Sequence, residues 1–217
     1  LITGAVRMDD SLEGHEPKYF NSIYVVDDRG EVLSAADKVH LVPFGEYVPY
    51  EDWLRQIGID NVISLPGGFT AANKRQMLDI GSDLRLYPLI CYEIIFPDEL
   101  GDELNESNAI LNVTNDGWFG DTPGPYQHLQ QARVRAVETG KYVIRAANTG
   151  ISAVIDPMGR IVAAFDFAQK GVIDATIARF VSDSLSKHDR STNFWLIISM
   201  LHALALFFAL PRRPRVD

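Results

Sequence analysis

The sequence contains a single cysteine, Cys91, among its 217 residues. One thiol excludes a scaffold of intrachain disulfides and a zinc site built from cysteines. Positive charge is also scarce, because 20 Lys and Arg stand against 29 Asp and Glu and leave a formal net charge of -9. Nucleic-acid surfaces need clustered Lys and Arg, so we expect no nucleic-acid partner.

Signals for bound cofactors are missing as well. The histidines are scattered along the chain without the spacing of metal ligands. The Gly-rich segment 66–68 lacks the Lys-Ser/Thr pair that completes a phosphate-binding loop. We therefore predict neither a metal nor another cofactor.

The chain also lacks an initiator methionine and a signal segment. Residues 1–6 (LITGAV) already read as a strand, with no basic region or cleavage site before them. We expect the chain to begin inside a domain and to be a portion of a longer protein.

What is present is the composition of a globular core, with 47% hydrophobic residues. Strand-like segments alternate with helical ones in the first part of the chain and form hairpins later, which indicates an α/β layered fold. The expected strands cover residues 1–6, 22–26, 31–33, 37–42, 84–90, 109–113, 142–147, 152–155 and 161–165. The expected helices cover residues 51–57, 97–106 and 128–139, the last one ended by Gly140.

The C-terminal segment differs in kind, because residues 191–211 carry no charge and 194–210 are nearly all apolar. A helix of about 17 residues rises roughly 26 Å, the lower limit for a membrane span. We expect a transmembrane helix at about 194–210, and the alternative is a buried or interfacial helix. The arginines beyond it, at 212, 213 and 215, favour a cytoplasmic C-terminus. The chain then divides into a catalytic domain at 1–186 and a membrane helix with a basic tail at 187–217.

Cys91 is the candidate nucleophile, because it ends the apolar run 86–90 and has a carboxylate, Glu93, two residues on. A thiol that cleaves amides or esters needs a base to take its proton and a cation or dipole to hold the oxyanion. Lys38 is the best candidate for the cation, and Glu46 follows it in a Pro- and Gly-rich loop. Spacing alone does not show that these residues converge, and a lone buried thiol is also typical of an inert core.

Three motifs carry a resemblance to a known family: DKVHLVPFGEYVP at 37–49, ICYEIIFP at 90–97 and NVTNDGWFG at 112–120. In this order they closely resemble those of the bacterial apolipoprotein N-acyltransferases, which are membrane-bound members of the nitrilase superfamily. The resemblance covers essentially the whole chain.

The resemblance implies a nitrilase-like αββα sandwich that lacks its first strands and is followed by one transmembrane helix. It implies the following residue roles: Cys91 as nucleophile; Lys38 as stabiliser of the tetrahedral intermediate; Glu46 and Glu93 as two further carboxylates required near the thiol; Tyr92 and Trp118 as aromatic residues of a lipid-facing pocket; and Phe44 and Tyr47 as parts of a loop beside the membrane. The general-base glutamate of the family lies upstream of Leu1, so we do not expect this chain to be active alone.

The implied reaction is a ping-pong acyl transfer. Cys91 takes an acyl group from a phospholipid and passes it to the N-terminal diacylglyceryl-cysteine of an apolipoprotein. The implied location is the bacterial inner membrane, with the catalytic domain on the periplasmic side. Two alternatives stay open: a carbon-nitrogen hydrolase for a small amide or nitrile, and a membrane-anchored domain without catalysis.

Overall fold

The computed structural model describes residues 1–11, 17–50, 56, 68–81, 84–178 and 190–209. The chain divides into two compact units, Leu1–Ser182 and Asp183–Asp217. The helix expected at 51–57 lies outside the described residues, apart from Gln56.

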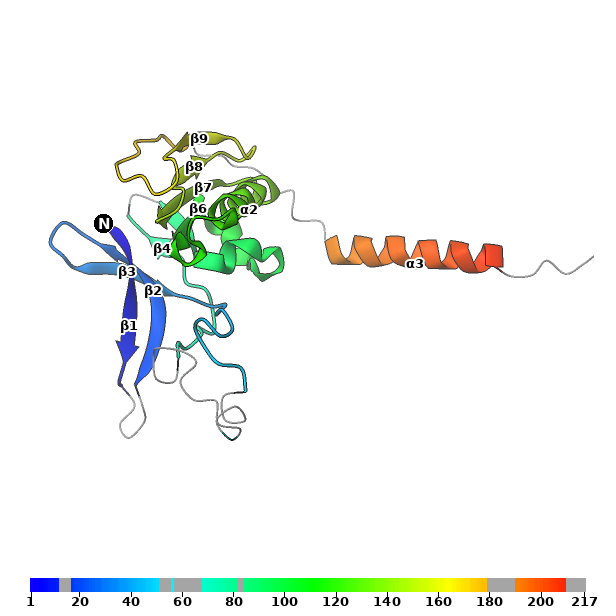
Figure 1. Ribbon diagram of the computed structural model, residues 1–217, viewed down its shortest axis with the longest axis horizontal. Helices are drawn as coiled ribbons and strands as arrows, with labels where there is room; N and C mark the ends of the chain where they lie inside the picture. The colour runs from blue at the N-terminus through cyan, green and yellow to red at the C-terminus, as the bar shows by residue number, and fades with distance from the viewer. Residues whose placement is uncertain (12–16, 51–55, 57–67, 82–83, 179–189, 210–217) are drawn as a thin grey trace, which may run out of the picture. The chain divides into compact units, whose positions relative to one another are not determined.

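The first sheet is antiparallel and has three strands, in the order β1-β2-β3. The strands are β1 (Ile2–Asp9), β2 (Lys18–Val26) and β3 (Val32–Asp37), drawn in blue in Figure 1. The turn between β2 and β3 is stabilised by Asp27, whose Oδ1 accepts hydrogen bonds from the N–H groups of Arg29 and Glu31. The strand and hairpin predicted at the start of the chain are therefore confirmed.

The second sheet has six strands, which follow one another in chain order. They are β4 (Leu78–Asp79), β5 (Arg85–Ile90), β6 (Ala109–Asn115), β7 (Tyr142–Asn148), β8 (Ala153–Ile155) and β9 (Ile161–Ala164). Strands β5, β6 and β7 are parallel, and the outer pairs are antiparallel. Strands β5 and β6 are the two long apolar runs of the sequence, and burial on both faces explains that composition.

The helical segments are α2 (Gly124–Thr139), α3 (Arg190–Ala209) and the 3₁₀ helices η1 (Cys91–Ile95), η2 (Pro97–Glu99), η3 (Asp102–Glu106) and η4 (Asp116–Phe119). Helix α2 begins four residues before the predicted start and ends at Gly140, which has a φ of 64°. That left-handed conformation suits glycine and closes the helix as predicted. The helix expected at 97–106 is instead the two short turns η2 and η3.

Two apolar cores show how the layers stack. On one face of the six-stranded sheet, Tyr87 and Leu89 pack with Leu129 of α2. On the other face, Leu86 and Ile90 pack with the three-stranded sheet. The described part of the first unit therefore has three layers, helix, sheet and sheet (Figure 1). The second helical layer of the predicted αββα sandwich is not found among the described residues.

The strand predicted at 37–42 is wrong, because β3 ends at Asp37. The N–H groups of Val39 and His40 donate to Oε1 of Glu93, at 3.0 and 2.9 Å, rather than to a neighbouring strand. A distant carboxylate therefore ends the strand, and local sequence cannot reveal that.

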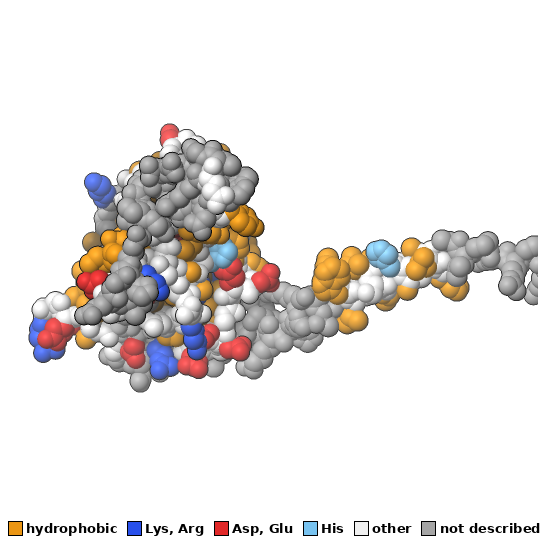
Figure 2. All heavy atoms as spheres, turned by 90° about the horizontal axis from the view of Figure 1, so that it is seen from below, with side chains coloured by type: hydrophobic (Ala, Val, Ile, Leu, Met, Phe, Trp, Pro, Cys, Tyr) orange, Lys and Arg blue, Asp and Glu red, His pale blue; other side chains and the backbone are white. Residues whose placement is uncertain are grey.

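Helix α3 carries the apolar C-terminal segment. Between residues 194 and 208, where its side chains are described, only Ser199 and His202 are polar, and most of the apolar side chains are exposed (Figure 2). Within the described residues, however, no helix is long and apolar enough to cross a membrane. The transmembrane helix predicted at 194–210 is therefore not confirmed.

Candidate active site

Cys91 lies directly after β5, at the carboxyl end of the parallel strands, where open α/β sheets commonly place their sites. Its φ is 54°, a left-handed conformation that is strained for a residue with a side chain. The thiol is half-buried and lines an open cavity of about 650 Å³. A sharp strand-to-helix turn thus presents the sulfur at the cavity wall.

Lys38 and Glu46 line the same cavity and form an ion pair. Lys38 is 1% exposed, and its Nζ lies 2.6 Å from Oε2 of Glu46. The carboxylate also accepts hydrogen bonds from Asn21 Nδ2 at 2.8 Å and from the N–H of Val42 at 2.8 Å. The loop after β3 therefore delivers a fixed ammonium group to the cavity that contains Cys91.

Glu93 plays a different part from the other predicted site residues. It is 1% exposed and is not among the residues that line the cavity. Its two oxygens accept five hydrogen bonds, from the N–H groups of Val39, His40 and Ile90 and from both terminal nitrogens of Arg75. Burial alone would lower the pKa of Arg75, but the hydrogen bond and charge of Glu93 raise it above its ordinary value. Glu93 thus ties the segment after Lys38 to the turn that carries Cys91.

The predicted aromatic residues divide into two groups. Tyr92 and Trp118 line the cavity, at 38% and 84% exposure, together with Phe119. Phe44 and Tyr47 lie in the neighbouring loop, where the N–H of Phe44 donates to the carbonyl of Tyr47, and they do not line the cavity. The structure therefore places Tyr92 and Trp118 beside Cys91 and leaves Phe44 and Tyr47 outside the cavity wall.

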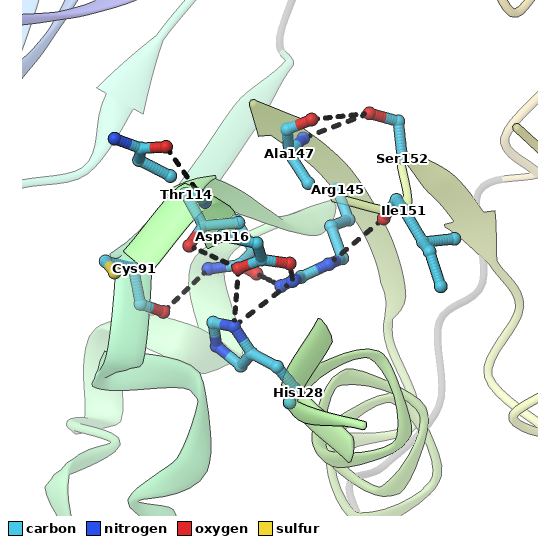
Figure 3. A network of polar contacts seen from close by, with 12 residues as sticks. Cys91, Thr114, Asp116, His128, Arg145, Ala147, Ile151 and Ser152 are labelled. Atoms are coloured by element: carbon cyan, nitrogen blue, oxygen red, sulfur yellow. Dashed lines mark hydrogen bonds and ion pairs between the residues drawn. The ribbon is translucent and has the colours of Figure 1, made fainter. Parts of the chain in front are cut away.

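Sequence reasoning missed a buried polar network behind Cys91 (Figure 3). Arg145 Nη2 lies 2.6 Å from Oδ2 of Asp116, and His128 Nδ1 lies 2.9 Å from Oδ1 of the same carboxylate. Arg145 also donates through Nη1 to Oδ1 of Asn112. The signal in the sequence was a polar residue, such as Asn112 or Arg145, inside an apolar strand segment. The contacts of Arg145 with Asp116 and Asn112 span 29 and 33 residues of the chain, so the sequence does not show these partners.

The network predicts a specific dependence of stability on pH. Burial alone would raise the pKa of Asp116, but the hydrogen bond from His128 and the charge of Arg145 hold it below its ordinary value of 3.8. A carboxyl whose pKa is lower in the folded state contributes stability that is complete above its unfolded pKa and is lost as the pH falls through its folded pKa. We expect Asp116→Asn to lower the melting temperature at neutral pH and to flatten its decline below about pH 4. If the melting temperature of Asp116→Asn declines below this pH as steeply as that of the wild type, Asp116 is not the group that causes the decline.

The geometry supports nucleophilic chemistry on a carbonyl compound. A thiol, a buried ammonium group and apolar walls share one cavity. The ammonium group is suited to stabilising an oxyanion, and the walls are suited to a hydrocarbon chain. Among the described residues that line the cavity, Glu46 is the one carboxylate, and Lys38 and Asn21 already engage it.

Comparisons with known proteins identify the family of this chain. The family model for carbon-nitrogen hydrolases matches residues 1–185. An apolipoprotein N-acyltransferase of Agrobacterium fabrum is 60% identical over 210 residues, which cover 97% of this chain and 40% of that protein. A protein of the same name from Rhizobium rhizogenes is 55% identical, over 95% of this chain and 39% of its own length. The chain thus spans about two fifths of the length of these relatives.

One solved structure shows the fold at greater distance. A carbon-nitrogen hydrolase from Helicobacter pylori G27 matches with a TM-score of 0.52 and 14% sequence identity. The match covers 78% of this chain and 60% of that one. At this identity the similarity concerns the α/β fold alone.

Proposed function

Because the chain belongs to the carbon-nitrogen hydrolase family, we propose that it forms the catalytic part of an apolipoprotein N-acyltransferase. The observation that carries the proposal is the half-buried Cys91 in an apolar cavity that also contains the buried Lys38. The names of the relatives supply the substrate class, an apolipoprotein that accepts an acyl group.

In the first half-reaction, the thiolate of Cys91 attacks the carbonyl carbon of a phospholipid acyl ester. Lys38 stabilises the negative charge that develops on the carbonyl oxygen. The ester C–O bond then breaks, a lysophospholipid leaves with a proton, and the acyl group remains on Cys91 as a thioester. The base that takes the thiol proton is the glutamate expected upstream of Leu1.

In the second half-reaction, the α-amine of the diacylglyceryl-cysteine attacks the thioester carbonyl. The C–S bond breaks, an amide forms, and the proton that the amine loses passes to the departing sulfur, so Cys91 regains its thiol. Hydrolysis competes with this step wherever water reaches the thioester. Apolar cavity residues such as Val42, Val113 and Phe119 limit that access.

One substrate of this reaction is a phospholipid and the other is a protein that carries a diacylglyceryl group, which is why we propose that the full-length protein works at the bacterial inner membrane. The cavity would lie on the periplasmic side and the C-terminus in the cytoplasm. The exposed apolar side chains of α3 support attachment to lipid, since such a surface is costly in water. Phe44, 59% exposed in the loop beside the cavity, is chemically suited to contact the membrane surface.

The decisive experiment uses the full-length protein in membranes, with and without Cys91→Ala. Membranes are incubated with radiolabelled phospholipid, and label on the protein is tested for release by hydroxylamine. We expect a hydroxylamine-labile acyl group on the wild-type protein and none on Cys91→Ala. A folded wild-type protein that acquires no label but cleaves a small amide would support the hydrolase alternative instead.

A further inference from the structure

The backbone of Cys91 is held from behind by a side chain of the neighbouring strand. Asn112 lies on β6 and is fully buried. Its Nδ2 donates to the carbonyl oxygen of Leu89 at 2.9 Å and to that of Cys91 at 3.2 Å. One amide group therefore links the end of β5 to the strained residue that follows it.

The orientation of Asn112 is itself fixed. Arg145 Nη1 donates to its Oδ1, so the opposite end of the amide, Nδ2, faces β5. Arg145 is held by Asp116 at 2.6 Å and by the carbonyl of Ile151 at 3.3 Å, and its side chain is fully buried. The amide thus has one fixed donor and two fixed acceptors, which leaves it no alternative arrangement of comparable energy.

The Cys91 carbonyl is a sensitive point for catalysis. In a trans peptide the carbonyl and the following N–H point in opposite directions, so the carbonyl of Cys91 and the N–H of Tyr92 turn together. A rotation of this peptide also moves the thiol, because the left-handed conformation of Cys91 sets where its side chain points. Displacements of about 1 Å can slow an enzymatic reaction about a hundredfold.

We propose that Asn112 is a positioning residue, oriented by Arg145 and Asp116, that fixes the peptide after Cys91 and thereby the direction in which the thiol meets its substrate. Burial lowers the pKa of the Arg145 guanidinium below its ordinary value, and the charge and hydrogen bond of Asp116 offset part of that shift. The inference rests on the proposed function, in which Cys91 is the nucleophile.

The test compares Asn112→Asp, Asn112→Ala and Asn108→Ala in the full-length protein in membranes. Asn112→Asp keeps the shape and an oxygen for Arg145 but loses the donor to Leu89 and Cys91. Asn108, directly before β6, accepts a hydrogen bond from the N–H of Arg85 at 2.7 Å and lies at the other end of the strand, so its alanine variant controls for the loss of an asparagine amide that bonds the backbone of β5.

Two rates are measured: alkylation of Cys91 by iodoacetamide across a range of pH, followed by mass spectrometry of the Cys91 peptide, and formation of the hydroxylamine-labile thioester. We expect both Asn112 variants to slow thioester formation by tenfold to a hundredfold, as orders of magnitude, and to alter the pH profile of alkylation. Asn108→Ala should match the wild type in both rates. Melting temperatures identify any variant that fails to fold. If Asn112→Ala fails to fold, the isosteric Asn112→Asp is compared with the wild type.

The outcomes separate this inference from the proposed function. If Asn112→Asp folds and equals the wild type in both rates, the positioning role is overturned. A different result would contradict the proposed function alone. In that case the wild type forms no thioester, but its Cys91 is alkylated faster than Cys91 of the Asn112 variants. The acyl-transfer proposal would then be wrong, and the positioning role of Asn112 would be supported.

Discussion

Replacing Lys38 by methionine is expected to slow acylation of Cys91 by about a hundredfold to a thousandfold, which is the usual cost of removing one group that stabilises an oxyanion. Lys38 is buried and fixed at 2.6 Å from Glu46, so its ammonium group is in place before the substrate binds. A fixed charge beside apolar walls stabilises a developing oxyanion more than a mobile charge on the surface does. The measurement is the rate at which hydroxylamine-labile label appears on the full-length protein.

The control must separate catalysis from the loss of a buried ion pair. Among the described residues, Lys38→Met leaves the carboxylate of Glu46 with Asn21 and the Val42 N–H as its donors, so some destabilisation is expected. The double variant Lys38→Met/Glu46→Gln removes both charges, and we expect it to melt at a higher temperature than the single variant while remaining equally slow. Lys74→Met, at an exposed pair with Glu103, should leave the rate unchanged. A folded Lys38→Met protein that is acylated at the wild-type rate would exclude the oxyanion role.

The sequence predicted the fold best in strands that are buried on both faces, because such strands consist almost entirely of apolar residues. The apolar runs that became β5 and β6 are covered on both faces, so they show strand length and continuous hydrophobicity. It failed at 37–42, where β-branched residues suggested a strand but Glu93, more than 50 residues away, takes the N–H groups of Val39 and His40. Local propensity cannot register such a competing acceptor.

The candidate site was predictable in part for a similar reason. Cys91, Lys38 and Glu46 were candidates from their residue types and from the motifs, and the structure brings all three to one cavity. The network behind them was not found, because a polar residue in a strand segment, such as Asn112 or Arg145, does not show which face it occupies or what it contacts. Only the parallel pairing of β6 with β7 places Asn112 opposite Arg145.

Glu93→Gln is expected to lower the free energy of unfolding by about 3–5 kcal/mol, the usual cost of breaking a buried ion pair from one side. The substitution leaves the buried guanidinium of Arg75 without its counter-charge. It also replaces one acceptor oxygen by an NH₂ group that must face the N–H donors now bound by the carboxylate. Because Glu93 joins the segment after Lys38 to the turn at Cys91, we expect thioester formation to fall together with the melting temperature.

The matched control is Glu106→Gln, since Glu106 also pairs with an arginine, Arg85, but at an exposed site with 67% and 50% side-chain exposure. There the effect should be at most about 1 kcal/mol. If Glu93 served instead as a proton acceptor for the thiol, Glu93→Gln would lose thioester formation while melting like the wild type. The five donors that saturate its oxygens argue for the structural outcome, in which stability and acylation decline together.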